Sequence, residues 1–254
     1  VTSMGALDAP VRSARRLGQA GPEAARDFGL ELGEVAASVG IDWVLAPVAD
    51  LDDGPAAGVI GDRSFGAETA AVATAFAAGL HEAGVAVTAK HFPGHGGDGD
   101  PHTGRTVDPA TLTELESAYL VPFRRLIADG AEAVMVGHVT YPTVWGELPA
   151  SLAPGAYELL RAQGFDGVAI TDALGMGAVH AQYGFDIAPA MAVSAGADAV
   201  LVNQGAEVLV LRDGLLAAVR EGRLDEDRLD AAVRRVLTLR GQDPDGVVCM
   251  PPEA

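Results

Sequence analysis

Hydrophobic residues fall into two kinds of segment that alternate along the chain. Short runs that are almost continuously apolar are typical of strands buried on both faces of a parallel sheet. Longer stretches mix apolar and charged residues and favour helices. Five short runs are predicted to be strands, at residues 43–48, 85–89, 133–138, 167–172 and 199–202.

The stretches around these strands carry helix signals. Residues 10–38 predict one or two helices, because Gly21-Pro22 interrupts the pattern. Thr111 and Glu114 have the spacing of a capping box, which predicts a helix that runs to about residue 128. Further helices are predicted at residues 68–83, 153–163, 186–195, 205–220 and 225–240.

This regular alternation predicts a parallel α/β fold, either a doubly wound sheet or a TIM-type (β/α)8 barrel. A closed barrel has eight strands, so five strands predict a barrel that is incomplete in this chain. Because no linker and no repeat beyond the βα unit is found, we expect a single domain over residues 1–254. Polar residues follow the predicted strands at their carboxyl ends, where both folds bind ligands: Asp50, Lys90, His91, His138, Asp172, Asn203 and Gln204.

Composition narrows the classes of partner. The 254 residues are 49% hydrophobic, which is enough for a sizeable core. The net charge of -18 argues against nucleic acid or an anionic membrane, since both need clustered Lys and Arg. No apolar run approaches the ~18 residues that span a bilayer, and no signal peptide is recognisable, which leaves the compartment open. The single cysteine, Cys249, excludes an intrachain disulfide.

Residues 90–102 are the densest segment in groups that titrate. They include the only lysine, Lys90, three of the six histidines and two aspartates. Glycines and prolines exclude a helix, so the segment predicts a loop at the end of a buried strand, where α/β proteins place chemistry. Asp100 and His102 suggest a carboxylate that holds an imidazole and tunes its proton affinity. A surface loop without a role is at least as compatible with these two residues viewed alone.

A metal site is an alternative for this segment, with ligands drawn from His91, His95, Asp98, Asp100 and His102. Two histidines at the spacing of His91 and His95 share a zinc ion only on a helix, and Pro93-Gly94 excludes a helix here. The glycines of residues 94–99 could cradle a phosphate, but no Gly-Lys-Ser/Thr follows them, which argues against a P-loop. We therefore expect neither a metal nor an organic cofactor.

Three further residues have a functional and a structural interpretation. Asp172 ends an apolar strand, where a carboxylate is costly unless it is paired, hydrated or facing a cavity, and the alternative is an N-cap for the next helix. His138 ends another strand and could equally be a core histidine with satisfied hydrogen bonds. Arg63 alone predicts a surface salt bridge. Together, the strand-end residues predict one common site.

Five segments of the chain carry recognisable motifs. The most specific is Lys-His-Phe-Pro-Gly-His-Gly at residues 90–96, followed by Asp100-Pro101-His102. The other four segments are residues 46–50, 61–65, 137–139 and 164–176. Together, in their order along the chain, these segments resemble glycoside hydrolase family 3 in its branch of bacterial β-N-acetylglucosaminidases. The resemblance extends over about residues 2–240 and implies a (β/α)8-type barrel.

The resemblance also implies the chemistry. The family is retaining, and Asp172 matches its nucleophile. His102, paired with Asp100 on a mobile loop, matches the acid/base, in place of the second carboxylate that most glycosidases use. No cofactor is implied. The substrate-binding residues that we predict on this basis are Arg63, Lys90, His91, His138, Asp50 and Met176.

The expected activity is retaining hydrolysis of terminal β-linked N-acetylglucosamine from glycans or peptidoglycan fragments. The expected partner is a small saccharide, and no oligomeric state is predicted. One alternative is a phosphorylase, because a histidine acid/base lacks the negative charge that would repel phosphate. Another is a non-catalytic, sugar-binding remnant of the fold. Family members carry earlier strands and an Asp-x-Glu-Gly-Gly motif that do not occur here, so we expect the chain to be N-terminally truncated.

Overall fold

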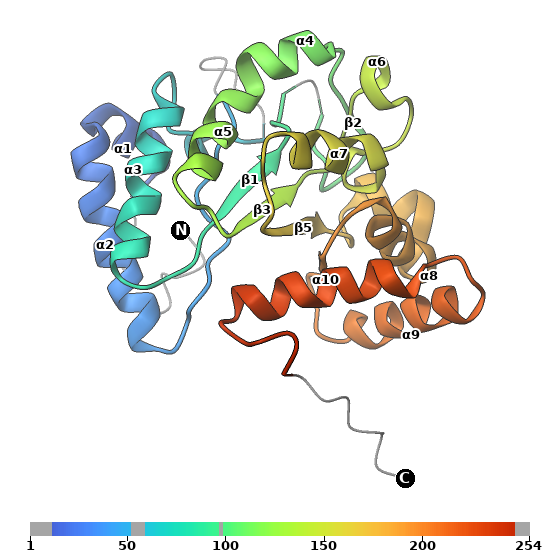
Figure 1. Cartoon of the computed structure of the whole chain (residues 1–254). Coiled ribbons are helices and arrows are strands. Elements are labelled where there is room, and N and C mark those ends of the chain that lie inside the picture. Colours follow the sequence, from blue (N-terminus) through green and yellow to red (C-terminus); the bar gives the residue numbers. More distant parts are fainter. Residues whose placement is uncertain (1–11, 52–58, 97–98, 247–254) are drawn as a thin grey trace.

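The computed structural model describes residues 12–51, 59–96 and 99–246 and contains a parallel sheet wrapped by helices (Figure 1). Its four strands pair in the order β1-β3-β5-β6, and every pair is parallel. Sheet order therefore follows chain order, as in a barrel. The strands are β1 (Thr88–Phe92), β3 (Ala133–Val136), β5 (Val168–Ala173) and β6 (Ala199–Leu201).

The fifth predicted strand, residues 43–48, lies beside β1. It is joined to β1 and the residues before it by two isolated parallel bridges, Trp43 with Ala86 and Val48 with Lys90. All five predicted strand positions are thus adjacent and parallel. They form an open arc in the part of the chain that the structure describes, in agreement with the predicted incomplete barrel.

The strands are apolar because both of their faces are covered. All four residues of β3 are buried, as expected for a strand between helices and a barrel interior. The largest buried apolar cluster draws residues from Ala14 to Leu211, and within it Phe92 packs edge to face on Phe123 at 5.4 Å. We therefore propose that the described residues form one domain.

The first helices follow the predicted boundaries. α1 (Ala14–Ala20) and α2 (Pro22–Ser38) are separated at Gly21, which has a φ of 94°. α2 packs against α3 (Thr69–Glu82), and glycines make this approach close. A Cβ on Gly79 would lie 2.1 Å from the Arg26 carbonyl oxygen, and one on Gly29 would lie 2.2 Å from that of Phe76.

The helix predicted after Thr111 is present but not uniform. Its capping box is confirmed, since the Thr111 backbone N–H donates to Glu114 Oε2 at 2.7 Å and the Glu114 backbone N–H donates to Thr111 Oγ1 at 3.3 Å. The π-helical turn in its middle was not predicted from the sequence. The run consists of α4 (Leu112–Glu114), the π-helical turn (Leu115–Tyr119) and α5 (Leu120–Ala128).

The later helices are α7 (Pro154–Ala162), α8 (Gly177–Ala195), α9 (Glu207–Arg220) and α10 (Glu226–Leu239). α8 begins at Gly177, well before the predicted start near residue 186. Gly177, Gly184 and Pro189 weaken the helix signal, and Gly184 is a non-helical kink with a φ of 64°. The shorter elements that were not predicted are β2 (Thr106–Val107), β4 (Val139–Thr140), α6 (Pro142–Trp145) and the 3-10 turns Gly61–Arg63 and Ala150–Leu152.

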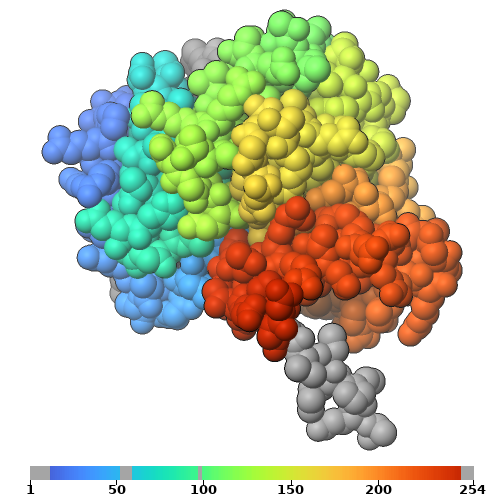
Figure 2. All heavy atoms as spheres, viewed as in Figure 1, coloured from blue at the N-terminus to red at the C-terminus, as the bar shows by residue number. Residues whose placement is uncertain are grey.

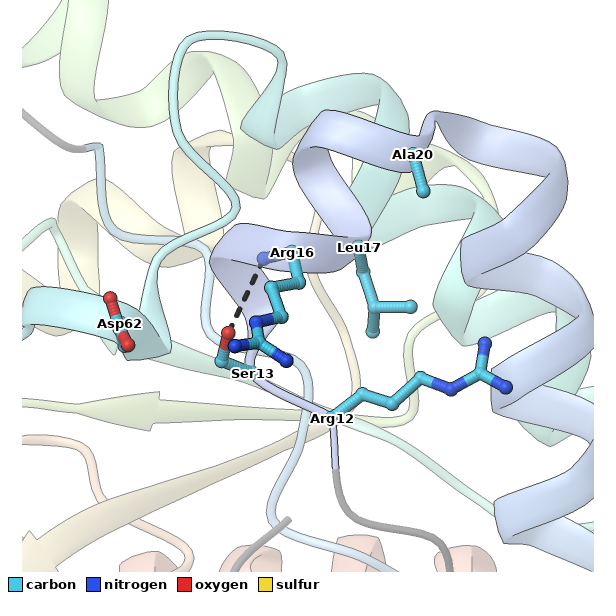
Figure 3. A pocket seen from close by; sticks show the side chains of 6 residues that line it. All are labelled: Arg12, Ser13, Arg16, Leu17, Ala20 and Asp62. Carbon is cyan, nitrogen blue, oxygen red and sulfur yellow. Dashed lines mark hydrogen bonds between the residues drawn. The ribbon is translucent and has the colours of Figure 1, made fainter.

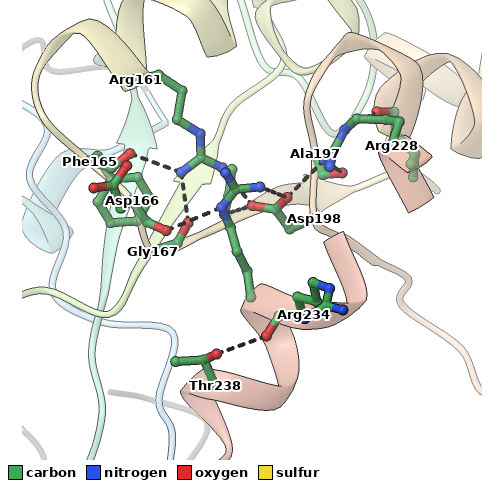
Figure 4. Close-up of polar contacts among 12 residues, drawn as sticks. Arg161, Phe165, Asp166, Gly167, Ala197, Asp198, Arg228, Arg234 and Thr238 are labelled. Carbon is green, nitrogen blue, oxygen red and sulfur yellow. Dashed lines mark hydrogen bonds and ion pairs between the residues drawn. The ribbon is translucent and has the colours of Figure 1, made fainter. Parts of the chain in front are cut away.

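A buried network of ion pairs around Asp198 connects α10 to the amino ends of the strands (Figure 4). The fully buried Asp198 carboxylate accepts hydrogen bonds from Arg161 at 2.6 Å, from Arg228 at 2.8 Å and from Arg235 at 3.3 Å. It also accepts the backbone N–H of Ala169 at 2.9 Å. Because Arg228 and Arg235 belong to α10, the network joins that helix to the strands β5 and β6.

The outer surface is made of helices. In the space-filling view the outward sides of α3, α5, α7 and α10 meet in one continuous face (Figure 2). Arg124 of α5 donates to the Gln163 side chain, just after α7, at 2.7 Å across one of these seams. Among the described helices, none has the length and apolar character needed to cross a bilayer.

Candidate active site

Most of the predicted site residues lie around a small hollow at the carboxyl ends of the strands. Its volume is about 120 Å³. Six of the predicted residues line it: Arg63, Lys90, His91, His102, Asp172 and Met176. The other residues of its wall are Leu45, Val59, Ile60, His95, Pro101, Met135 and Leu201.

Lys90 and His91 both face this pocket. Strict alternation along β1 would place consecutive side chains on opposite faces of the sheet. The pairing of β1 with β3 shifts register between Lys90 and Phe92. The regular alternation is therefore interrupted where the strand enters the pocket.

Asp50 positions His91 by hydrogen bonds on the side of the ring that faces away from the pocket. The Nδ1 atom of His91 lies 2.7 Å from Asp50 Oδ2, and the backbone N–H of His91 donates to Asp50 Oδ1 at 3.1 Å. Burial raises the pKa of Asp50, but attraction to His91 and these hydrogen bonds outweigh it, so the pKa lies below the usual value. Asp50 is fully buried and does not line the pocket, so it reaches the site through His91.

The other nitrogen of His91 faces Arg63 and Asp172. Nη2 of Arg63 lies 3.3 Å from His91 Nε2, and a guanidinium can only donate. We infer that Nε2 accepts and that the ring proton sits on Nδ1, where it is donated to Asp50. Oδ2 of Asp172 lies 3.9 Å from the same Nε2.

Asp172 is an ionised carboxylate that still reaches the pocket. Its side chain is 19% exposed, and Oδ1 accepts the backbone N–H of Ala173 at 2.7 Å. Burial raises the pKa of Asp172, but electrostatic attraction to the His91 and His138 rings, the Ala173 hydrogen bond and Lys90 outweigh it and hold the pKa below its usual range. At neutral pH the group is therefore available as a nucleophile.

Lys90 lies among both kinds of charge. Burial lowers the pKa of Lys90 to about 8, and repulsion from Arg63 acts in the same direction. Asp172 and Asp50 oppose this shift. At neutral pH most Lys90 side chains remain protonated, so Lys90 and Arg63 are hydrogen-bond donors on one wall of the pocket.

His102 lines the pocket and pairs with Asp100, and both side chains are more exposed than that of Asp172. Nδ1 of His102 lies 2.6 Å from Asp100 Oδ1, which also accepts the His102 backbone N–H at 2.9 Å. The His102 side chain is 56% exposed and that of Asp100 is 42% exposed. The backbone hydrogen bond first, and then the imidazole, hold the pKa of Asp100 below its usual value.

The start of α8 anchors the loop that carries this pair. The backbone N–H groups of Gly177 and Ala178 donate to the carbonyl oxygens of His102 and Pro101, at 3.1 and 3.0 Å. The first N–H groups of a helix have no partner within the helix, so the loop supplies acceptors for them. Residue 177 has no room for a side chain, because a Cβ there would lie 2.8 Å from the Thr103 carbonyl carbon.

The structure places His138 behind the pocket wall. The ring is buried, Nδ1 accepts the Ser151 hydroxyl at 2.7 Å, and Nε2 donates to the Ala173 carbonyl oxygen at 3.0 Å. Burial lowers the pKa of His138. His138 is not among the residues that line the pocket, so it supports the strand end next to Asp172.

His95 lines the pocket, although the sequence suggested it only as a metal ligand. The described residues contain no group of three or more His, Cys, Asp or Glu side chains with the arrangement of a metal site. Asp98, from the same metal hypothesis, lies outside the described residues, as does Cys249. The sequence signal for His95 was its place in the titratable segment 90–102, which did not distinguish a pocket wall from a surface loop.

A larger hollow beside α1 differs in character (Figure 3). Its volume is about 450 Å³, and Arg12, Arg16 and Asp62 supply its charged groups. In Figure 3 the Ser13 hydroxyl caps α1 by accepting the Arg16 backbone N–H, at 3.3 Å. This hollow contains no pairing of a carboxylate with a histidine, so the smaller pocket is the candidate active site.

Comparison with known proteins gives a consistent match. The family described as "Glycosyl hydrolase family 3 N terminal domain" matches residues 9–239. The curated protein Beta-hexosaminidase LpqI of Mycobacterium tuberculosis is 41% identical over 244 residues, which cover 91% of this chain and 63% of that protein. The chain therefore spans less than two thirds of the length of this relative.

Solved structures agree in fold. A glycosyl hydrolase of the GH3 family from Mycobacterium smegmatis superposes with a TM-score of 0.88 at 39% identity, over 93% of this chain and 74% of that one. A family 3 β-N-acetylglucosaminidase from Paenibacillus gives 0.86 at 38% identity, over 97% of this chain and 48% of that one. The open arc of parallel strands is thus part of a TIM-type barrel.

Proposed function

Because the chain belongs to glycosyl hydrolase family 3, we propose that it is a retaining β-N-acetylhexosaminidase that removes terminal β-linked N-acetylglucosamine from glycans or peptidoglycan fragments. The names of the similar proteins support the substrate class. The observation that carries the proposal is that Asp172, held ionised, lines the same pocket as His102.

In the first proposed step, Asp172 attacks the anomeric carbon of the sugar. The bond from that carbon to the leaving oxygen breaks, its electron pair stays on the oxygen, and His102 gives this oxygen a proton. The products are a glycosyl ester on Asp172 and the free leaving alcohol. The low pKa of Asp172 supports its part as the nucleophile.

In the second step, water replaces the ester. His102 removes a proton from water while the oxygen attacks the anomeric carbon, and the Asp172 carboxylate leaves. Two inversions give net retention. Asp100 would orient the imidazole and stabilise its cationic form, as the aspartate of a catalytic triad does, and its 2.6 Å contact with Nδ1 supports this assignment.

The remaining polar groups divide into two sets. Arg63, Lys90 and His91 line the pocket and would bind the hydroxyl groups of the sugar, with Met176 as an apolar part of the wall. Asp50 and His138 are buried behind it. We propose that they act by positioning His91 and the backbone beside Asp172.

Hydrolysis of 4-nitrophenyl β-N-acetylglucosaminide tests the proposal. We expect turnover by the chain, loss of at least about a thousandfold in Asp172→Asn, and no change in the matched control Asp129→Asn. Asp129 is exposed at the end of α5. NMR should show the β anomer of N-acetylglucosamine as the first product. The α anomer, or an active Asp172→Asn variant, would contradict the mechanism.

A phosphorylase is the second candidate, and the histidine of the His102–Asp100 pair favours it. A second carboxylate in that place would repel phosphate from the glycosyl ester, and an imidazole does not. The same assay with added phosphate separates the two reactions. A rate that rises with phosphate, with sugar 1-phosphate as the product, supports the phosphorylase, and free sugar at every phosphate concentration supports the hydrolase.

A further inference from the structure

His95 is presented to the pocket by a backbone turn that is fixed on both sides. Before it, the Gly94 N–H donates to the His91 carbonyl oxygen at 2.8 Å, and the Tyr141 hydroxyl donates to the Gly94 carbonyl oxygen at 2.7 Å. After it, Gly96 packs so closely that a Cβ would lie 2.2 Å from Asp108 Oδ2. The direction of His95 is therefore set by its neighbours.

The ring nitrogens of His95 are available for hydrogen bonds to a ligand. It packs edge on against His91, with ring centroids 6.2 Å apart. Among the described residues, no hydrogen bond joins either of its ring nitrogens to another group, whereas both nitrogens of His91 are engaged. The residue is partly buried and lines the pocket, so a molecule that enters the pocket can bond to the ring.

The ring is neutral at neutral pH. Burial lowers the pKa of His95, and repulsion from His91 and Arg63 adds to this effect against the attraction of Asp50 and Asp172. A neutral imidazole offers one N–H donor and one acceptor nitrogen. Lys90 and Arg63 only donate, and an ionised Asp172 only accepts, so His95 differs from them in offering both.

His95 lines the same pocket as the two proposed catalytic groups, Asp172 and His102. Its ring packs against His91, whose Nε2 atom lies 3.9 Å from Asp172 Oδ2. In a retaining glycosidase the nucleophile and the acid flank the anomeric carbon, so a side chain that shares their small pocket is within reach of a substituent close to that carbon. In an N-acetylglucosaminide the neighbouring carbon 2 carries an acetamido group, which has one N–H donor and one carbonyl acceptor.

We propose that His95 is the residue that recognises the 2-acetamido group and so selects N-acetylglucosaminides over glucosides. This inference rests on the proposed function. The donor and the acceptor of the neutral ring complement the carbonyl and the N–H of the acetamido group. The cationic wall formed by Lys90 and Arg63 remains available for the sugar hydroxyls.

The test compares 4-nitrophenyl β-N-acetylglucosaminide with 4-nitrophenyl β-glucoside. We expect His95→Leu to lower kcat/KM roughly tenfold for the first substrate through KM, and less than about twofold for the second. His95→Gln, whose amide both donates and accepts, should recover most of the loss. The matched control His81→Leu lies at the amino end of the barrel and should leave the ratio of the two substrates unchanged.

Equal losses for both substrates, or no recovery in His95→Gln, would show that His95 is only a packing residue and would overturn the proposal. Ligand-observed NMR of N-acetylglucosamine and glucose adds a measurement that needs no turnover. If the wild-type chain binds N-acetylglucosamine preferentially and His95→Leu does not, the inference stands even where the hydrolase proposal fails. If the preference persists in His95→Leu, or is absent from the wild type, the inference fails.

Discussion

The imidazole of His91 and the carboxylate of Asp50 fix each other by two contacts, 2.7 Å from Nδ1 and 3.1 Å from the backbone N–H. Both residues are buried, and a buried charge that loses its partner is strongly destabilising. Asp50 therefore determines which nitrogen of His91 carries the proton. It thereby leaves Nε2 as the acceptor that faces Arg63 and Asp172.

The stability of this pair should depend on pH. The pKa of Asp50 is lower in the folded chain than the ~3.9 of an unfolded one. Its contribution is therefore present above about pH 4 and is lost as the pH falls through the folded value. We expect Asp50→Asn to cost roughly 3 kcal/mol in urea unfolding at pH 7, and the difference from wild type to shrink at pH 3. A constant difference, or an equal loss in Asp129→Asn, would contradict this.

Asp100 should matter for turnover and not for folding. Both it and His102 are largely exposed, so substitution changes the free energy of unfolding by less than about 0.5 kcal/mol. Loss of the carboxylate leaves the imidazole without its orienting partner, and we expect Asp100→Asn to lower kcat roughly a hundredfold. Steady-state kinetics beside a thermal melt checks both parts. A lower Tm that accompanies the loss of kcat would mean that the pair is structural.

His138 should act on the site through the backbone. Ser151→Ala removes the donor to its buried Nδ1, which should cost about 1–3 kcal/mol of stability. Because the same ring holds the Ala173 carbonyl beside Asp172, we also expect kcat/KM to fall several-fold. Urea unfolding and kinetics measure the two effects, and Ser194→Ala, at an exposed position, is the control. Unchanged kinetics would separate His138 from the site.

The strands could be predicted from the sequence because a strand buried on both faces is apolar at every position, as in Ala133–Val136. The separate roles of the polar residues at the strand ends could not be predicted from the sequence. Asp50, His138 and Asp172 all follow apolar strands, and only tertiary structure shows that Asp172 lines the pocket and the other two lie behind it. The early start of α8 was missed for a related reason, since its first N–H groups are satisfied by the distant residues Pro101 and His102.

The ion network at the amino ends of the strands should control stability without controlling chemistry. Asp198 is fully buried between three arginines, so Asp198→Ala leaves them without their carboxylate. We expect a loss of roughly 3 kcal/mol or more in urea unfolding and little change in KM for the molecules that stay folded. Asp213→Ala, which breaks an exposed ion pair with Arg212, should cost at most about 1 kcal/mol. Equal costs for the two variants would show that the network is not cooperative.

Gly177 connects α8 to the loop of the acid/base pair, and its substitution should move that loop. A Cβ at position 177 would lie 2.8 Å from the Thr103 carbonyl carbon and 3.0 Å from the His102 carbonyl oxygen. All the atoms that this Cβ would contact belong to the loop backbone, and no flexible side chain could move aside instead. The loop must therefore shift and carry His102 with it. A displacement of about 1 Å at a catalytic group can cost on the order of a hundredfold in rate.

We therefore expect Gly177→Ala to lower kcat at least tenfold while the Tm changes by only a few degrees, because alanine also favours the helix by about 1 kcal/mol. Gly205→Ala is the matched control, since its Cβ would meet nothing within 4 Å. Steady-state kinetics with the 4-nitrophenyl substrate measures the effect. If Gly177→Ala keeps the wild-type kcat, then the contact of the loop with α8 does not set the position of His102 during turnover, and the loop must leave α8 in the reacting complex.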